Sequence, residues 1–165
     1  MRKVKLEEVA EVFGGYAFKS KDFIGYSKTP VIKISSIQNG TVDSDNIADF
    51  LPDEYFDKYK RYEVKQGDIL VALSGATTGK TGVYRLKYPA LLNQRVGLVR
   101  AKRGAISQKY LNYYVSKLTD EILQKAQGVA QPNISTKELS KFEIPLPTLD
   151  EQKAIVAKLD RAQRL

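Results

Sequence analysis

A loop of glycines, hydroxyl side chains and one lysine is the first candidate for chemistry in this chain. Residues 75–81 read Gly-Ala-Thr-Thr-Gly-Lys-Thr. Glycine and threonine leave backbone N–H groups accessible and Lys80 adds a positive charge, so the loop is suited to binding a phosphate. That phosphate could belong to a nucleotide or to a nucleic acid backbone.

A nucleotide-binding P-loop is the first alternative. That motif has four residues between its first glycine and its Gly-Lys-Ser/Thr, whereas residues 75–81 have three. A P-loop also opens into a helix, whereas residues 82–86 predict a strand. The pattern therefore disfavours NTP binding. It leaves a plain hairpin loop, or a loop that meets DNA with Lys80 on phosphate and Ser74, Thr77 or Thr78 near base edges.

The distribution of charge favours nucleic acid. The 165 residues include 27 basic and 19 acidic ones, which gives a net charge of +8. Residues 58–109 contain twelve basic residues and only two acidic ones, so the basic surplus surrounds the loop. A concentrated positive field of this kind is typical of proteins that bind nucleic acid.

Several classes of chemistry are excluded by composition, because the chain has neither histidine nor cysteine. It can form no Ser-His-Asp triad, no histidine-ligated zinc site, no thiolate site and no disulfide. We predict no metal and no cofactor, and an enzyme ranks third among the possible functions. No apolar run approaches the roughly 18 residues of a membrane span, and the N-terminus turns acidic where a signal peptide needs an apolar core. We therefore expect a cytoplasmic protein.

Hydrophobic periodicity predicts one mixed α/β domain. We expect strands around residues 31–34, 69–73, 82–86 and 96–100, and helices over residues 6–12, 53–60 and 107–127, the last ended by Gly128. The aromatic residues of the second helix are predicted to pack in the core rather than to stack on bases. They are Tyr55, Phe56, Tyr59 and Tyr62.

Two capping boxes mark helix starts near the C-terminus, one at Ser135 with Glu138 and one at Thr148 with Glu151. The helix after Thr148 carries a narrow apolar seam like that of a coiled coil. The seam consists of Ile155, Leu159 and Ala162, and it predicts a subunit interface in a homodimer or a heteromer.

Six segments, taken in order, resemble one target-recognition domain of the specificity subunit of type I restriction–modification enzymes. They are residues 6–15, 30–40, 67–75, 92–94, 128–135 and 144–152, of which the last, with Ile144-Pro145-Leu146-Pro147 before Glu151-Gln152, is the most specific. The resemblance implies a twisted, partly barrel-like mixed sheet with flanking helices over residues 1–147. It further implies that residues 148–165 begin a long spacer helix.

The same resemblance implies a function. The specificity subunit is not itself catalytic; it reads DNA and positions separate methyltransferase and endonuclease subunits. A full-length subunit carries two recognition domains, each reading one half of a split target, held apart by two long antiparallel helices. This chain has one such domain, so we expect either a fragment or a half-subunit that pairs with a copy of itself.

Five loops are predicted to line the DNA face, because their side chains carry positive charge or can both donate and accept hydrogen bonds. Their residues are Lys19, Ser20, Lys21, Ser36, Gln38, Asn39, Ser74, Thr77, Thr78, Lys80, Asn93, Gln94, Arg95, Gln131 and Asn133. The alternative is a stand-alone nucleic-acid-binding or protein-interaction module without a restriction role. RNA ranks below DNA, since no aromatic stacking motif lies on a predicted strand.

Overall fold

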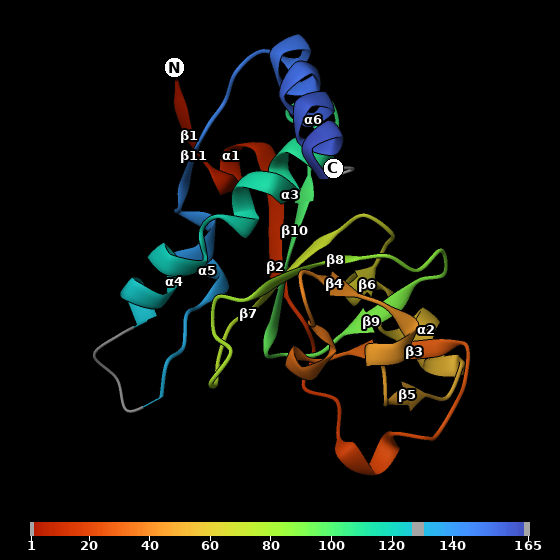
Figure 1. Cartoon of the computed structure of the whole chain (residues 1–165). Coiled ribbons are helices and arrows are strands. Elements are labelled where there is room, and N and C mark those ends of the chain that lie inside the picture. The colour runs from red at the N-terminus through yellow and green to blue at the C-terminus, as the bar shows by residue number, and fades with distance from the viewer. Residues whose placement is uncertain (1, 127–130, 164–165) are drawn as a thin grey trace.

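A five-stranded sheet forms the centre of the computed structural model, which describes residues 2–126 and 131–163. Its strand order is β2-β10-β7-β8-β4, and every neighbouring pair is antiparallel except β4 with β8 (Figure 1). The strands are β2 (Ala10–Gly14), β4 (Thr41–Val42), β7 (Ile69–Ala72), β8 (Thr81–Tyr84) and β10 (Val96–Ala101).

Two smaller sheets complete the β-structure. A four-stranded sheet has the order β5-β3-β9-β6, with β3 and β9 parallel. Its strands are β3 (Thr29–Ile32), β5 (Phe50–Leu51), β6 (Glu63–Val64) and β9 (Ala90–Leu92). The third sheet pairs β1 (Lys3–Lys5) with β11 (Glu143–Pro145), so a ladder joins two segments that are far apart in the sequence.

The apolar runs of the central strands are explained by burial on both faces of the sheet. Ile69 and Val71 of β7 enter one core together with the helices, whereas Leu70 and Ala72 enter a second core against the four-stranded sheet. Figure 1 shows this arrangement, with most helices on one side of the central sheet and β3, β5, β6 and β9 on the other. The predicted mixed α/β fold is confirmed, and the described strands form open sheets rather than a closed barrel.

Six α-helices are present among the described residues, in addition to four short 3-10 helices. The α-helices are α1 (Leu6–Val9), α2 (Glu54–Lys58), α3 (Gln108–Ser116), α4 (Thr119–Ala126), α5 (Thr136–Ser140) and α6 (Leu149–Gln163). The two predicted caps are confirmed: the hydroxyls of Ser135 and Thr148 accept hydrogen bonds from the N–H groups of Glu138 and Glu151. Ser107, the predicted first residue of the third helix, is also an N-cap, and its hydroxyl accepts from the N–H of Tyr110 at 3.4 Å.

Two helix predictions are wrong in extent. The first helix ends at Val9, because Ala10–Gly14 instead pairs with β10 as strand β2. The helix from Ser107 is broken after Ser116, where Leu118 is buried and the Thr119 hydroxyl donates to the carbonyl of Gly79 at 2.7 Å. A separate helix, α4, then begins at Thr119. The predicted helix end at Gly128 lies outside the described residues.

Candidate functional site

The loop of residues 74–80 connects β7 to β8 and is held by a segment from the far end of the domain. The N–H of Ile134 donates to Leu73 O at 2.8 Å, and the N–H of Gly75 donates to Pro132 O at 3.2 Å. Ser74 and Asn133 therefore form an isolated antiparallel bridge. Two of the predicted loops are thus adjacent, although more than 50 residues separate them in the sequence. A strand follows the first loop, so the helix that a P-loop requires is not formed here.

Thr78 organises the interior of this loop. Its hydroxyl donates to Gly75 O at 2.6 Å and reaches Pro132 O at 3.2 Å, and the residue is 2% exposed. The hydroxyl oxygen of Ser74 is also buried and has no hydrogen-bond partner among the described residues. Lys80, in contrast, is exposed, and its side chain has no partner in the part of the chain that the structure describes.

A tight turn lies beside Lys80. Asn39 and Gly40 have positive φ angles of 53° and 78°, as the predicted Asn-Gly turn requires. This turn and the end of the 74–80 loop border a hollow of about 360 Å³. The residues lining it are Ile37, Gln38, Asn39, Gly40, Lys80, Thr81 and Thr119. The hollow thus brings two predicted loops to one place.

The loop between β9 and β10 joins the same region. The N–H of Leu73 donates to Arg95 O at 2.9 Å, and the N–H of Asn93 donates to Ile32 O at 3.0 Å. The side chains of Gln94 and Arg95 are exposed, whereas Asn93 is 7% exposed. This loop therefore presents one amide and one guanidinium to solvent beside the 74–80 loop.

The fifth predicted loop, at residues 19–21, is linked to the others through Tyr16. The N–H of Tyr16 donates to Leu92 O at 2.9 Å, and a Cβ placed on the preceding Gly15 would lie 2.1 Å from that oxygen. Only glycine permits this close approach. Lys19, Ser20 and Lys21 follow on an exposed turn.

An aromatic cluster supports that turn. The ring centroid of Tyr59 lies 4.7 Å from that of Tyr16 and 5.0 Å from that of Phe18. A hydrogen bond and the charge of Tyr59 are the main reasons that the pKa of Tyr16 is raised above its ordinary value. Tyr55 and Tyr59 pack against the small core that contains Phe18, so the interpretation of the aromatic stripe as core packing is confirmed.

The structure divides the predicted contact residues by accessibility. Ser36, Thr78 and Asn93 are buried, and the Ser36 hydroxyl accepts a hydrogen bond from the N–H of Lys33 at 3.0 Å. We therefore assign these three residues to holding the loops and leave them out of the contact surface. Ser74 and Thr77 are partly exposed. The exposed members are Lys19, Ser20, Lys21, Gln38, Asn39, Lys80, Gln94, Arg95, Gln131 and Asn133.

Thr119 is a site residue that sequence reasoning missed. It lines the 360 Å³ hollow and its hydroxyl holds the Gly79 carbonyl, although 40 residues separate the two. No local pattern around Thr119 signals this contact, since the partner loop is distant in sequence.

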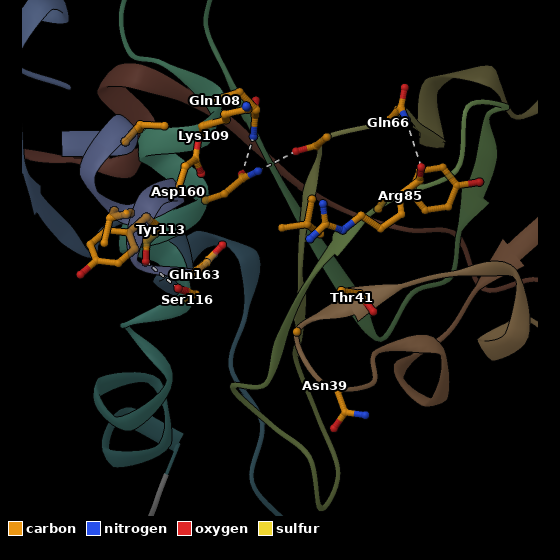
Figure 2. Close-up of a pocket in the computed structure, with 17 residues that line it drawn as sticks. Asn39, Thr41, Gln66, Arg85, Gln108, Lys109, Tyr113, Ser116, Asp160 and Gln163 are labelled. Atoms are coloured by element: carbon orange, nitrogen blue, oxygen red, sulfur yellow. Dashed lines mark hydrogen bonds between the residues drawn. The ribbon is translucent and has the colours of Figure 1, made fainter. Parts of the chain in front are cut away.

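A second, larger cavity of about 740 Å³ lies between α3, α6 and the edge of the central sheet (Figure 2). Three of the amide side chains that line it form hydrogen bonds within the protein. Gln108 donates to Asn112 Oδ1 at 2.7 Å, Asn112 donates to Gly67 O at 2.8 Å, and Gln66 donates to Arg85 O at 3.0 Å. No group of three or more acidic side chains in the described ranges could hold a metal ion.

The predicted seam of α6 is divided between three environments. Ile155 packs against the helical core, Leu159 lines the larger cavity, and Ala162 is exposed. The apolar seam is therefore used in part within this chain, against α3. Its role between chains stays a prediction.

The comparisons with known proteins agree with this architecture. The family model for the type I restriction modification DNA specificity domain matches residues 1–164. The type I restriction enzyme MjaVIII specificity subunit of Methanocaldococcus jannaschii is 33% identical over 168 residues, which cover 98% of this chain and 39% of that subunit.

Two solved structures are similar over 99% of this chain, both at 25% identity. The HsdS subunit from Thermoanaerobacter tengcongensis has a TM-score of 0.75, and the chain covers 37% of it. A structure from work on complex assembly and conformational transition of the type I R-M system has a TM-score of 0.77, with 38% of that chain covered. The resemblance seen in the six segments is confirmed, and this chain belongs to the family of type I restriction modification DNA specificity domains.

Proposed function

We propose that this chain is a sequence-specific DNA-recognition unit of a type I restriction–modification system. It reads one half of a bipartite target and positions separate methyltransferase and endonuclease subunits. The observation that carries the proposal is the gathering of four loops from distant parts of a chain of this family. Residues 38–39, 80, 94–95 and 131–133 contribute exposed cations and amides around β7 and β8.

The two kinds of side chain have different roles in this proposal. Lys80 and Arg95 neutralise phosphates, which supplies affinity without sequence information. The amides read bases, because an amide can donate and accept at once and so form a bidentate pair with adenine in the major groove. They are Gln38, Asn39, Gln94, Gln131 and Asn133.

Catalysis in the proposed assembly belongs to other subunits. The chain contributes binding and positioning, and the methyltransferase and endonuclease subunits supply the chemistry.

None of the helices in the described ranges is both long enough and apolar enough to cross a membrane. We place the chain in the cytoplasm together with its DNA.

Selection of bound duplexes from a random pool tests the proposed function. We expect enrichment of one short sequence, because several amides at fixed positions discriminate between bases by about 1–3 kcal/mol for each good pair. A pool of random single-stranded RNA serves as the control for general attraction to polyanions. Equal retention of all duplex sequences would contradict sequence-specific reading.

We also propose that α6 joins the chain to a second copy of itself or to a partner subunit. Ala162 is the exposed member of the predicted seam, so Ala162→Asp is expected to convert a homodimer into a monomer by placing a charge at the interface. Sedimentation velocity measures the change, and Ala157→Asp on another exposed side of α6 is the control. A monomeric parent chain would contradict the homodimer.

A further inference from the structure

Gln152 is the buried residue of α6, the helix that leaves the domain. It is 1% exposed, whereas the neighbouring residues Glu151 and Lys153 are exposed. Glutamine is seldom fully buried, because both halves of its amide then need partners. The position of Gln152 in the first turn of α6 suggests a reason for its burial.

The Gln152 amide bridges the starts of two helices. Its Oε1 accepts from the N–H of Ser107 at 2.8 Å, and its Nε2 donates to Pro147 O at 2.9 Å. Ser107 is the N-cap of α3, and Pro147 directly precedes Thr148, the residue from which α6 begins. The orientation of the amide is unambiguous, since a backbone N–H can only donate and a carbonyl can only accept.

Beyond this amide, the contacts of α6 with the domain differ along the helix. Ile155 and Val156 are partly buried against the helical core, and the following turns border the open 740 Å³ cavity. From Gln152 to Gln163 the helix extends about 16 Å at 1.5 Å per residue. A tilt of about 10° in the first turn would therefore move the far end by about 3 Å. The direction of α6 thus depends strongly on how its first turn is held.

We propose that Gln152 is a positioning residue that fixes the direction of α6 relative to the loops that contact DNA. An apolar side chain of similar volume would fill the same space but would leave the Ser107 N–H and the Pro147 carbonyl without partners. Those groups would regain hydrogen bonds only by letting the two helix starts move apart. The amide therefore fixes the angle between the starts of α3 and α6, in addition to filling space in the core.

This inference rests on the proposed function for its consequence. If α6 holds two recognition units together, its direction determines how many base pairs separate the two half-sites that they read. Loss of the Gln152 amide would then relax the preference for one separation, while each unit would still recognise its own half-site.

Distance measurements between two spin labels test the geometry without DNA. The chain has no cysteine, so Asp57→Cys on α2 and Lys158→Cys on α6 create two labelling sites, both exposed. We expect a narrow distance distribution in this parent. Gln152→Met should broaden it, because methionine retains the volume and loses both hydrogen bonds, whereas Lys153→Met, one residue away and exposed, should leave it unchanged. An unchanged distribution in Gln152→Met would overturn the proposal.

A second pair of variants isolates the Ser107 N–H in case Gln152→Met does not fold. Ser107 has φ −72°, which proline adopts readily, and proline has no N–H to donate. Ser107→Ala removes the same capping hydroxyl but retains the N–H. We expect a broader distance distribution in Ser107→Pro than in Ser107→Ala, and equal widths would overturn the proposal.

Duplexes carrying two half-sites at separations stepped by one base pair test the consequence. The parent is expected to prefer one separation, and Gln152→Met is expected to lose this preference while binding a single half-site with parental affinity. A retained preference would overturn the role in spacing. A parent that binds no duplex at all would contradict the proposed function instead, and the label distances would still decide the role of Gln152.

Discussion

Replacing Lys80 and Arg95 together by alanine is expected to weaken binding to a cognate duplex by about 100-fold at ~0.1 M salt. Each phosphate contact contributes about 0.9 to the slope of log affinity against log salt, which is close to tenfold per contact at that concentration. The slope should therefore fall by about 2 in the double variant. Fluorescence anisotropy over a series of salt concentrations measures both quantities.

The two positions suit this experiment because their side chains do not support the fold. Both are exposed, and neither side chain has a partner within residues 2–126 and 131–163. Their loops are held by backbone groups: Ala72 N–H donates to Lys80 O and Leu73 N–H donates to Arg95 O, each at 2.9 Å. Alanine preserves these bonds, so a loss of affinity reports on contact with DNA.

A matched control separates a local contact from net charge. Lys87→Ala with Lys158→Ala removes two positive charges from exposed positions outside the predicted loops. This control is expected to retain most of the affinity at ~0.1 M salt, where screening limits charges farther than about 10 Å from the phosphates. Equal losses in both double variants would contradict the assignment of Lys80 and Arg95 as contacts.

The second large effect concerns stability. Asp68→Ala is expected to lower the free energy of unfolding by about 3 kcal/mol, the lower end of the range for breaking a buried ion pair. Asp68 is 3% exposed and accepts two hydrogen bonds from Arg100, from Nε at 2.9 Å and from Nη2 at 2.7 Å. It also accepts from the N–H of Lys65 at 2.7 Å. Without the carboxylate, these donors lose their partner.

The surroundings of the Arg100 side chain explain why we expect a loss of stability at the lower end of the range for a buried ion pair. That side chain is 22% exposed and also donates to Glu63 O at 2.9 Å, so water and one carbonyl can compensate in part. Burial lowers the pKa of Arg100, but the hydrogen bond and the charge of Asp68 outweigh it, and the net shift is upward. The guanidinium stays charged when Asp68 is removed, because the ordinary pKa of arginine lies far above neutral pH. A partly buried charge without its partner is the costly situation.

Urea unfolding of the parent, Asp68→Asn and Asp68→Ala measures the effect. Asparagine can still accept from the Lys65 N–H, so we expect Asp68→Asn to lie between the other two. Exposed Asp57→Ala, on α2, is the control and should change stability by less than about 0.5 kcal/mol. An Asp68→Ala protein as stable as the control would contradict the importance of this ion pair.

Local features of the fold were predictable from the sequence. The caps at Ser135 and Thr148 were found, because an N-cap bond joins residues only two or three positions apart and leaves a fixed pattern. Strand β7, which precedes the 75–81 loop, was found for a related reason, since a run buried on both faces stays apolar. The errors arose where contact with a distant helix or strand determines the local secondary structure. Residues 10–12 suit a helix or a strand by spacing, and pairing with β10 selects the strand.

The candidate site shows the same division. Residue types alone predicted which loops contact DNA, because cations and amides are the groups that bind phosphates and base edges. The tertiary structure decided which of them face solvent. Thr78 and Asn93 were predicted as contact residues together with Lys80 and Gln94, yet they are buried. It also formed two long-range hydrogen bonds, one between Thr119 and Gly79, 40 residues apart, and one between Gln152 and Ser107, 45 residues apart. Composition and neighbouring residues determine what a segment can bind, whereas long-range packing determines which groups remain free to bind it.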